Sequence, residues 1–154
     1  LIESILKDIE QTNITYFKNL VENENYHAID IFLVFFSKYK GIHKDKFSNF
    51  SRDLDKFYPC ISKDNENRTI KIFEDFYYSI LKKGIEENLF RDDIDIEISS
   101  QMLALHIISL MKFSNKSRVP INKISAYYCD IILRAISTDI GLDYYLNNKD
   151  KYKL

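Results

Sequence analysis

Residues 96–113 have the sequence IEISSQMLALHIISLMKF, and this stretch decides the fold class. Its apolar residues recur at spacings of three and four and also fill positions between them, a pattern typical of a helix that is apolar on more than one face. Residues 120–137 show the same pattern. A helix in a small monomer needs one apolar stripe against its core, so the second face predicts burial against another subunit.

The first third of the chain is also helical in pattern. Apolar residues at helical spacing predict an amphipathic helix over residues 1–21 and a largely buried helix over residues 26–39, which Gly41 is expected to end. A short helix then runs to Tyr58 and must stop there, because a proline disfavours helical geometry in the residue before it.

The later helix boundaries are also marked by single residues. A long helix is expected to begin between residues 63 and 67 and to end at Asn88, a residue type that tolerates left-handed geometry. Asp95 is placed to cap the next helix at its N-terminus. Gly141 is expected to close a turn, and the Tyr-rich residues 143–152 to add one more exposed helix. The sequence therefore predicts an all-α fold of six to seven helices.

Composition narrows the class of protein further. With 154 residues the chain is the size of one domain. Its 3 Gly and 2 Pro are too few turn-forming residues for a sheet protein of this length. The 22 basic and 23 acidic residues are mixed along the chain, so no electrostatic footprint for nucleic acid stands out. No apolar run approaches a membrane span, and no signal-peptide layout is present, which predicts a cytoplasmic protein with buried, unpaired thiols at Cys60 and Cys129.

Three segments carry a resemblance to a known family. Residues 79–95, SILKKGIEENLFRDDID, resemble the segment of tetracycline-repressor (TetR) family regulators in which a long helix ends in a Gly-Ile-x-x-Gly-x-Phe-Arg-x-Asp pattern, with Asn88 in place of the second Gly. Residues 132–141 are similar to the end of the family's last dimerisation helix. Residues 52–59 resemble the short helix before the long pocket helix. The matches follow the family's order from residue 51 to residue 141.

The resemblance implies a fold like the TetR C-terminal domain, in which the last two long helices pair with their symmetry mates in a four-helix bundle. It implies that residues 1–154 form an effector-binding and dimerisation domain, with residues 1–21 as the connecting helix. The helix-turn-helix domain that binds operator DNA would precede this sequence and is not part of it. The predicted dimer contacts are Leu105, Ile108, Met111, Ile124, Tyr128, Ile131, Ile132 and Ala135.

Aromatic residues are the candidates for a ligand pocket. Most of them are expected to build core, but inward-facing rings in a helical bundle could also hold an apolar or aromatic effector, with tyrosine hydroxyls fixing its orientation. His106 is either a hydrogen-bonding group in that cavity or a core or interface histidine with a backbone or tyrosine partner. The predicted pocket residues are Tyr16, Phe32, Phe35, Phe36, Tyr39, Phe73, Phe76, Tyr77, Met102 and His106.

No catalytic or cofactor motif is present in the sequence. The three histidines are scattered, and no Gly-rich phosphate loop, HExxH or GxSxG pattern occurs. The acidic residues 92–97 have no calcium-binding register and are interpreted as a solvated loop in which Asp95 is a cap. The prediction is a ligand-responsive, homodimeric transcriptional regulator, by default a repressor, that is not an enzyme and has no metal or membrane partner. The alternative is a helical protein-interaction or scaffold module without DNA binding.

Overall fold

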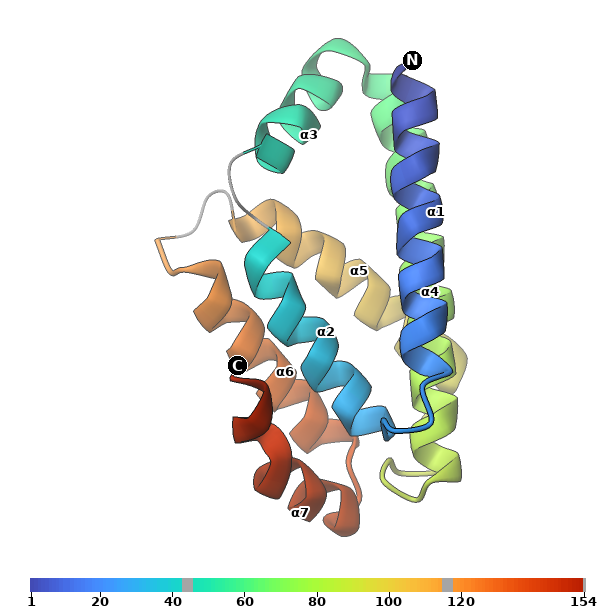
Figure 1. Cartoon of the computed structure of the whole chain (residues 1–154), viewed down its shortest axis with the longest axis vertical. Helices are drawn as coiled ribbons and strands as arrows, with labels where there is room; N and C mark the ends of the chain where they lie inside the picture. Colours follow the sequence, from blue (N-terminus) through green and yellow to red (C-terminus); the bar gives the residue numbers. More distant parts are fainter. Residues whose placement is uncertain (43–45, 115–117, 154) are drawn as a thin grey trace.

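A computed structural model shows an all-helical chain (Figure 1). It describes residues 1–42, 46–114 and 118–153, with only the backbone described for residues 39–42, 46–48, 113 and 114. In these ranges the only β-type pairing is an isolated bridge between Phe90 and Ser137. The helices are α1 (Ile2–Val21), α2 (Ala28–Ile42), α3 (Lys46–Phe57), α4 (Pro59–Glu86), α5 (Ile96–Ser114), α6 (Ile121–Ile136), α7 (Asp139–Asn148) and a 3-10 turn (Lys149–Tyr152).

Helices α1 and α4 lie side by side, and α5 returns along α4 (Figure 1). Phe17 stacks on Phe76 and Lys83 reaches the carbonyl of Val21, so α1 and α4 run in the same direction. Helix α2 is central, since it packs against α1, α4, α6 and α7, and its side chains from Ala28 to Leu33 are all buried. The prediction of a largely buried second helix is confirmed.

The end of α4 forms the turn that the sequence predicts. Asn88 has φ 58°, in the left-handed region. The N–H of Leu89 donates to the carbonyl of Gly84 at 2.9 Å and that of Asn88 to Ile85 at 3.0 Å, which is the paired bonding of a Schellman motif. Asp95 then accepts the N–H of Ile98 at 2.9 Å and caps α5, also as predicted.

Two boundary predictions and one prediction of exposure differ from the structure. Helix α4 begins at Pro59 and not near residues 63–67, because a proline that blocks the preceding helix fits the first position of the next, where no N–H is needed. Helix α2 continues past Gly41 to Ile42, since one glycine costs a helix only about 1 kcal/mol. The C-terminal segment is helical as predicted, but it is exposed on one side only, because Tyr145 is buried and half-buried Tyr144 and Tyr152 face α2.

No helix among the described residues combines the length and the apolarity that a membrane crossing requires.

Candidate functional site

The predicted pocket rings meet in the middle of the molecule. We call seven of the side chains there the aromatic cluster: Phe17, Phe32, Phe35, Phe36, Phe73, Phe76 and Tyr77. All seven are buried, and neighbouring rings lie with their centroids 4.2 to 6.4 Å apart. Six of the seven were predicted to line a pocket. In this conformation the rings pack on one another, at distances typical of favourable aromatic pairs.

Other predicted pocket residues lie at the edge of this cluster or away from it. Tyr16 is half-buried beside Phe17, and the ammonium of Lys38 lies 3.7 Å from the centre of its ring. Met102 and His106 are exposed on α5, outside the cluster. The side chain of Tyr39 lies outside the described ones.

Phe17 was not among the predicted pocket residues. It stacks on Phe76 at 4.2 Å with 17° between the ring planes. The sequence held a signal for Phe17, because helical spacing places it on the same side of α1 as Leu6 and Leu20. This side is the buried stripe of the helix, and Tyr16 lies at its edge.

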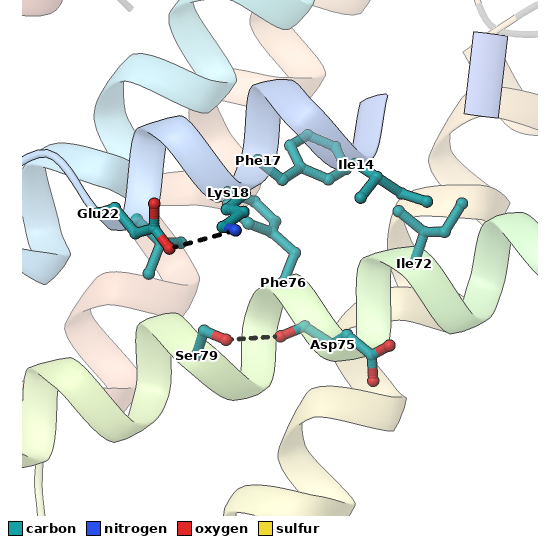
Figure 2. Close-up of a pocket in the computed structure, with 9 residues that line it drawn as sticks. Ile14, Phe17, Lys18, Glu22, Ile72, Asp75, Phe76 and Ser79 are labelled. Carbon is teal, nitrogen blue, oxygen red and sulfur yellow. Dashed lines mark hydrogen bonds and ion pairs between the residues drawn. The ribbon is translucent and has the colours of Figure 1, made fainter. Parts of the chain in front are cut away.

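A groove runs along the outer side of this stacked pair, between α1 and α4 (Figure 2). Its volume is about 310 Å³. Ile14 and Ile72 flank the rings, and the loose ion pair of Lys18 with Glu22, at 3.9 Å, lies over one end. The further lining residues are Val21, Asp75 and Ser79. The groove therefore offers an aromatic floor with a polar edge, a combination typical of sites for small apolar molecules that carry one polar group.

Two helices present apolar side chains to solvent. On α5, Ile98, Met102 and Leu105 are each more than half exposed and follow one another at spacings of four and three. On α6, Tyr127 and Ile131 are 69 and 47% exposed. We call the outward side of these two helices the α5–α6 face. Scattered apolar residues are normal on protein surfaces, but apolar stripes at helical spacing on two consecutive helices are typical of an interaction surface.

A second groove lies where α5 ends and α6 begins. Leu110 and Val119 share a groove of about 510 Å³ with one side of α6. The α6 residues that line it are Lys123, Ile124, Tyr127, Tyr128 and Ile131. The ring of His106 lies edge-on to that of Tyr128, with centroids 6.0 Å apart. Burial raises the pKa of Tyr128, whose hydroxyl has no hydrogen-bond partner among the described atoms.

The predicted dimer contacts fall into three groups in the structure. Leu105, Ile131 and Ala135 are exposed on the α5–α6 face. Ile108 is buried in the core. Half-buried side chains make up the third group: Met111, Ile124, Tyr128 and Ile132.

A polar cluster lies at the N-terminal end of α2, around the buried carboxylate of Asp30. Asp30 is 3% exposed and accepts hydrogen bonds from the N–H of His27 at 3.0 Å and from the hydroxyls of Tyr144 and Tyr152 at 2.7 and 2.9 Å. Within the described ranges, no lysine, arginine or histidine side chain forms an ion pair with Asp30. Burial, together with the bond to Asp30, raises the pKa of both tyrosines, so both remain protonated donors at neutral pH.

A second carboxylate completes the cap of α2. Glu87, at the end of α4, accepts the N–H of Ala28 at 2.8 Å, and its other oxygen lies 3.3 Å from Nδ1 of His27. Carboxylates are favoured at a helix N-terminus because its first N–H groups lack partners within the helix. The cluster therefore joins the start of α2 to the end of α4 and to the C-terminal segment.

The acidic loop forms an ion pair and a helix cap. Asp93 pairs with Arg91 at 3.4 Å and Asp95 caps α5, and no group of three metal-ligating side chains occurs among the described residues. Both cysteines are free. Cys129 is buried as predicted, but Cys60 is exposed, because it lies in the first turn of α4 and outside the core.

Comparison of the chain with models of known protein families, with characterised proteins and with solved structures finds no match.

Proposed function

We propose that this chain is the ligand-sensing and dimerisation part of a TetR-family transcriptional regulator, acting by default as a repressor. The observation that carries the proposal is the α5–α6 face, where two consecutive helices turn apolar stripes to solvent. Two copies related by a two-fold axis would bury four such helices against one another, the arrangement that the family resemblance implies.

The aromatic cluster and the α1–α4 groove support the sensing role. A molecule bound beside Phe17 and Phe76 contacts both α1, the proposed connecting helix, and the long helix α4. If the ligand binds better to an arrangement in which α1 holds the two DNA-binding domains at the wrong spacing, operator affinity falls by that differential affinity. A ligand with the opposite preference would activate binding.

The dimer is tested by sedimentation velocity of the chain across the micromolar range. We expect a dimer for the wild type and a monomer for the double variant Leu105→Glu/Ile131→Glu, which places charges on both stripes without touching the core. The control is Ile5→Glu, because Ile5 is 40% exposed on α1, a helix that packs on α2 and α4. A wild type that stays monomeric contradicts the proposed homodimer and favours a different protein partner on the same face.

The sensing role needs a separate measurement. We expect 2-naphthol, an apolar aromatic molecule with one hydroxyl, to cause saturable NMR shifts in the amides of residues 14–22 and 72–79. Saturation confined to α5 and α6 would contradict the placement of the ligand. The DNA-binding role requires the full-length gene product, tested for operator binding in gel shifts with and without ligand. Full-length protein that lacks a helix-turn-helix segment contradicts the regulator.

A further inference from the structure

The C-terminal segment holds together parts of the fold that are distant in sequence. We call residues 138–152 the C-terminal strap; it packs on α2 and α6, and the C-terminal end lies beside α2 (Figure 1). At its start, the hydroxyl of Thr138 donates to the carbonyl of Asn88 at 2.9 Å, and its N–H donates to the carbonyl of Leu89 at 3.0 Å. At its end, Tyr144 and Tyr152 reach Asp30, more than a hundred residues earlier in the chain.

Helix α6 packs mainly on α2 and also contacts α7 of the strap. The hydroxyl of Tyr145, a residue only 2% exposed, donates to Asp130 of α6 at 2.7 Å. Arg134 binds the other oxygen of Asp130 at 2.8 Å. Cys129 and Leu133 face the core, which leaves Tyr127 and Ile131 on the outward side of the same helix. A shift of the inner face of α6 must therefore move its outer face as well.

The burial of Asp30 gives the strap two alternative states, docked on Asp30 and undocked. Among the described residues, the buried carboxylate of Asp30 accepts hydrogen bonds from one backbone N–H and from the two strap hydroxyls. A buried carboxylate that loses its hydrogen-bond donors is costly, and the cost is relieved when water reaches it. Loss of the tyrosine bonds therefore favours an undocked strap in which Asp30 is hydrated.

We propose that the C-terminal strap is a conformational switch for self-association, in which docking on Asp30 holds α6 in the position that builds the dimer surface. The inference rests on the proposed dimer through the α5–α6 face. Docking and dimerisation are then linked, so that each favours the other by the same factor. Whatever loosens the strap weakens the dimer, although no strap residue belongs to the α5–α6 face.

The test compares the dimer dissociation constant of the wild type with that of Tyr144→Phe/Tyr152→Phe by sedimentation velocity. We expect the double variant to dimerise at least about fivefold more weakly, the lower end of typical coupling between linked sites. Tyr78→Phe is the matched control, because Tyr78 is an exposed tyrosine on α4 far from the strap in sequence, and it should leave the constant unchanged. If the double variant does not fold, judged by circular dichroism, Tyr152→Phe alone replaces it and should weaken the dimer in the same direction.

Amide hydrogen exchange gives the reciprocal measurement. When the wild-type concentration is raised through the dissociation constant, exchange at residues 140–148 should slow along with exchange at α6. A folded double variant that dimerises as tightly as the wild type overturns the switch and leaves the dimer standing. Amide exchange at the strap that does not change with protein concentration also overturns the switch and leaves the dimer standing. A wild type that is monomeric throughout overturns both the switch and the proposed dimer.

Discussion

Asn88 provides a test of the turn that ends α4 without disturbing any side-chain contact. Its backbone is left-handed, with φ 58°, and its side chain is exposed. A residue with a Cβ loses about 1–2 kcal/mol in this region, asparagine loses less, and glycine loses almost nothing. We therefore expect Asn88→Val to lower the free energy of unfolding by about 1–2 kcal/mol relative to Asn88→Gly, with the wild type between them or equal to the glycine variant.

Urea unfolding followed by circular dichroism measures this difference, and calorimetry should show about 2–4 °C in Tm for each kcal/mol in a chain of this size. The control is the same pair of substitutions at Asn67, an exposed asparagine inside α4. There the order should reverse, because glycine is the poorer helix former. Equal stability of Asn88→Val and Asn88→Gly would refute the left-handed turn, and with it the match of Asn88 to the family's second glycine.

Three further predictions concern a close backbone contact, a hydrogen-bonded carboxylate and the exposure of the two cysteines. Gly141→Ala sets a Cβ against the backbone carbonyl of Leu89, so calorimetry should show a loss of about 1–3 kcal/mol; no loss would mean that α7 sits farther from the turn. Burial raises the pKa of Asp130, but its hydrogen bonds with Arg134 and Tyr145 outweigh burial and lower this pKa below the ordinary 3.8. The stability that these bonds contribute is therefore present above pH 3.8 and is lost as the pH falls through the lowered pKa. The destabilisation by Asp130→Asn, up to about 1 kcal/mol at pH 7, should therefore shrink below 3.8 in urea titrations, and a pH-independent difference would contradict the bond. A thiol reagent should modify Cys60 at once and Cys129 only on unfolding, because burial raises the pKa of the Cys129 thiol; two fast thiols would contradict the core.

The helices could be predicted because their signals are local. Helix spacing depends on residues three and four positions apart, and the C-terminal end of α4 and the start of α5 were correctly placed by Asn88 and Asp95. The start of α4 was misplaced because its first turns are polar and exposed, so hydrophobic periodicity gives no signal there. Pro59, which starts that helix, was interpreted only as a stop.

The strap could not be predicted for a different reason. Its tyrosines bind carboxylates on other helices, and periodicity identifies the face of a helix without identifying what that face meets. A tail with three tyrosines and several charged residues has the composition of an exposed helix. Only the tertiary arrangement shows that Asp30 is buried and that Tyr144 and Tyr152 supply its hydrogen bonds.

Helix α5 shows the same limit, with a consequence for the dimer. Its sequence is apolar on more than one side, so the pattern alone does not decide which side turns inward. Packing against α4 decides it: the small residues Ser100 and Ala104 are buried there, in line with Ile108, and allow close approach of the two helices. Ile108, a predicted dimer contact, is therefore a core residue. Met102, a predicted pocket residue, lies instead on the outward stripe, so an interface through α5 should include Met102 and leave Ile108 to the core.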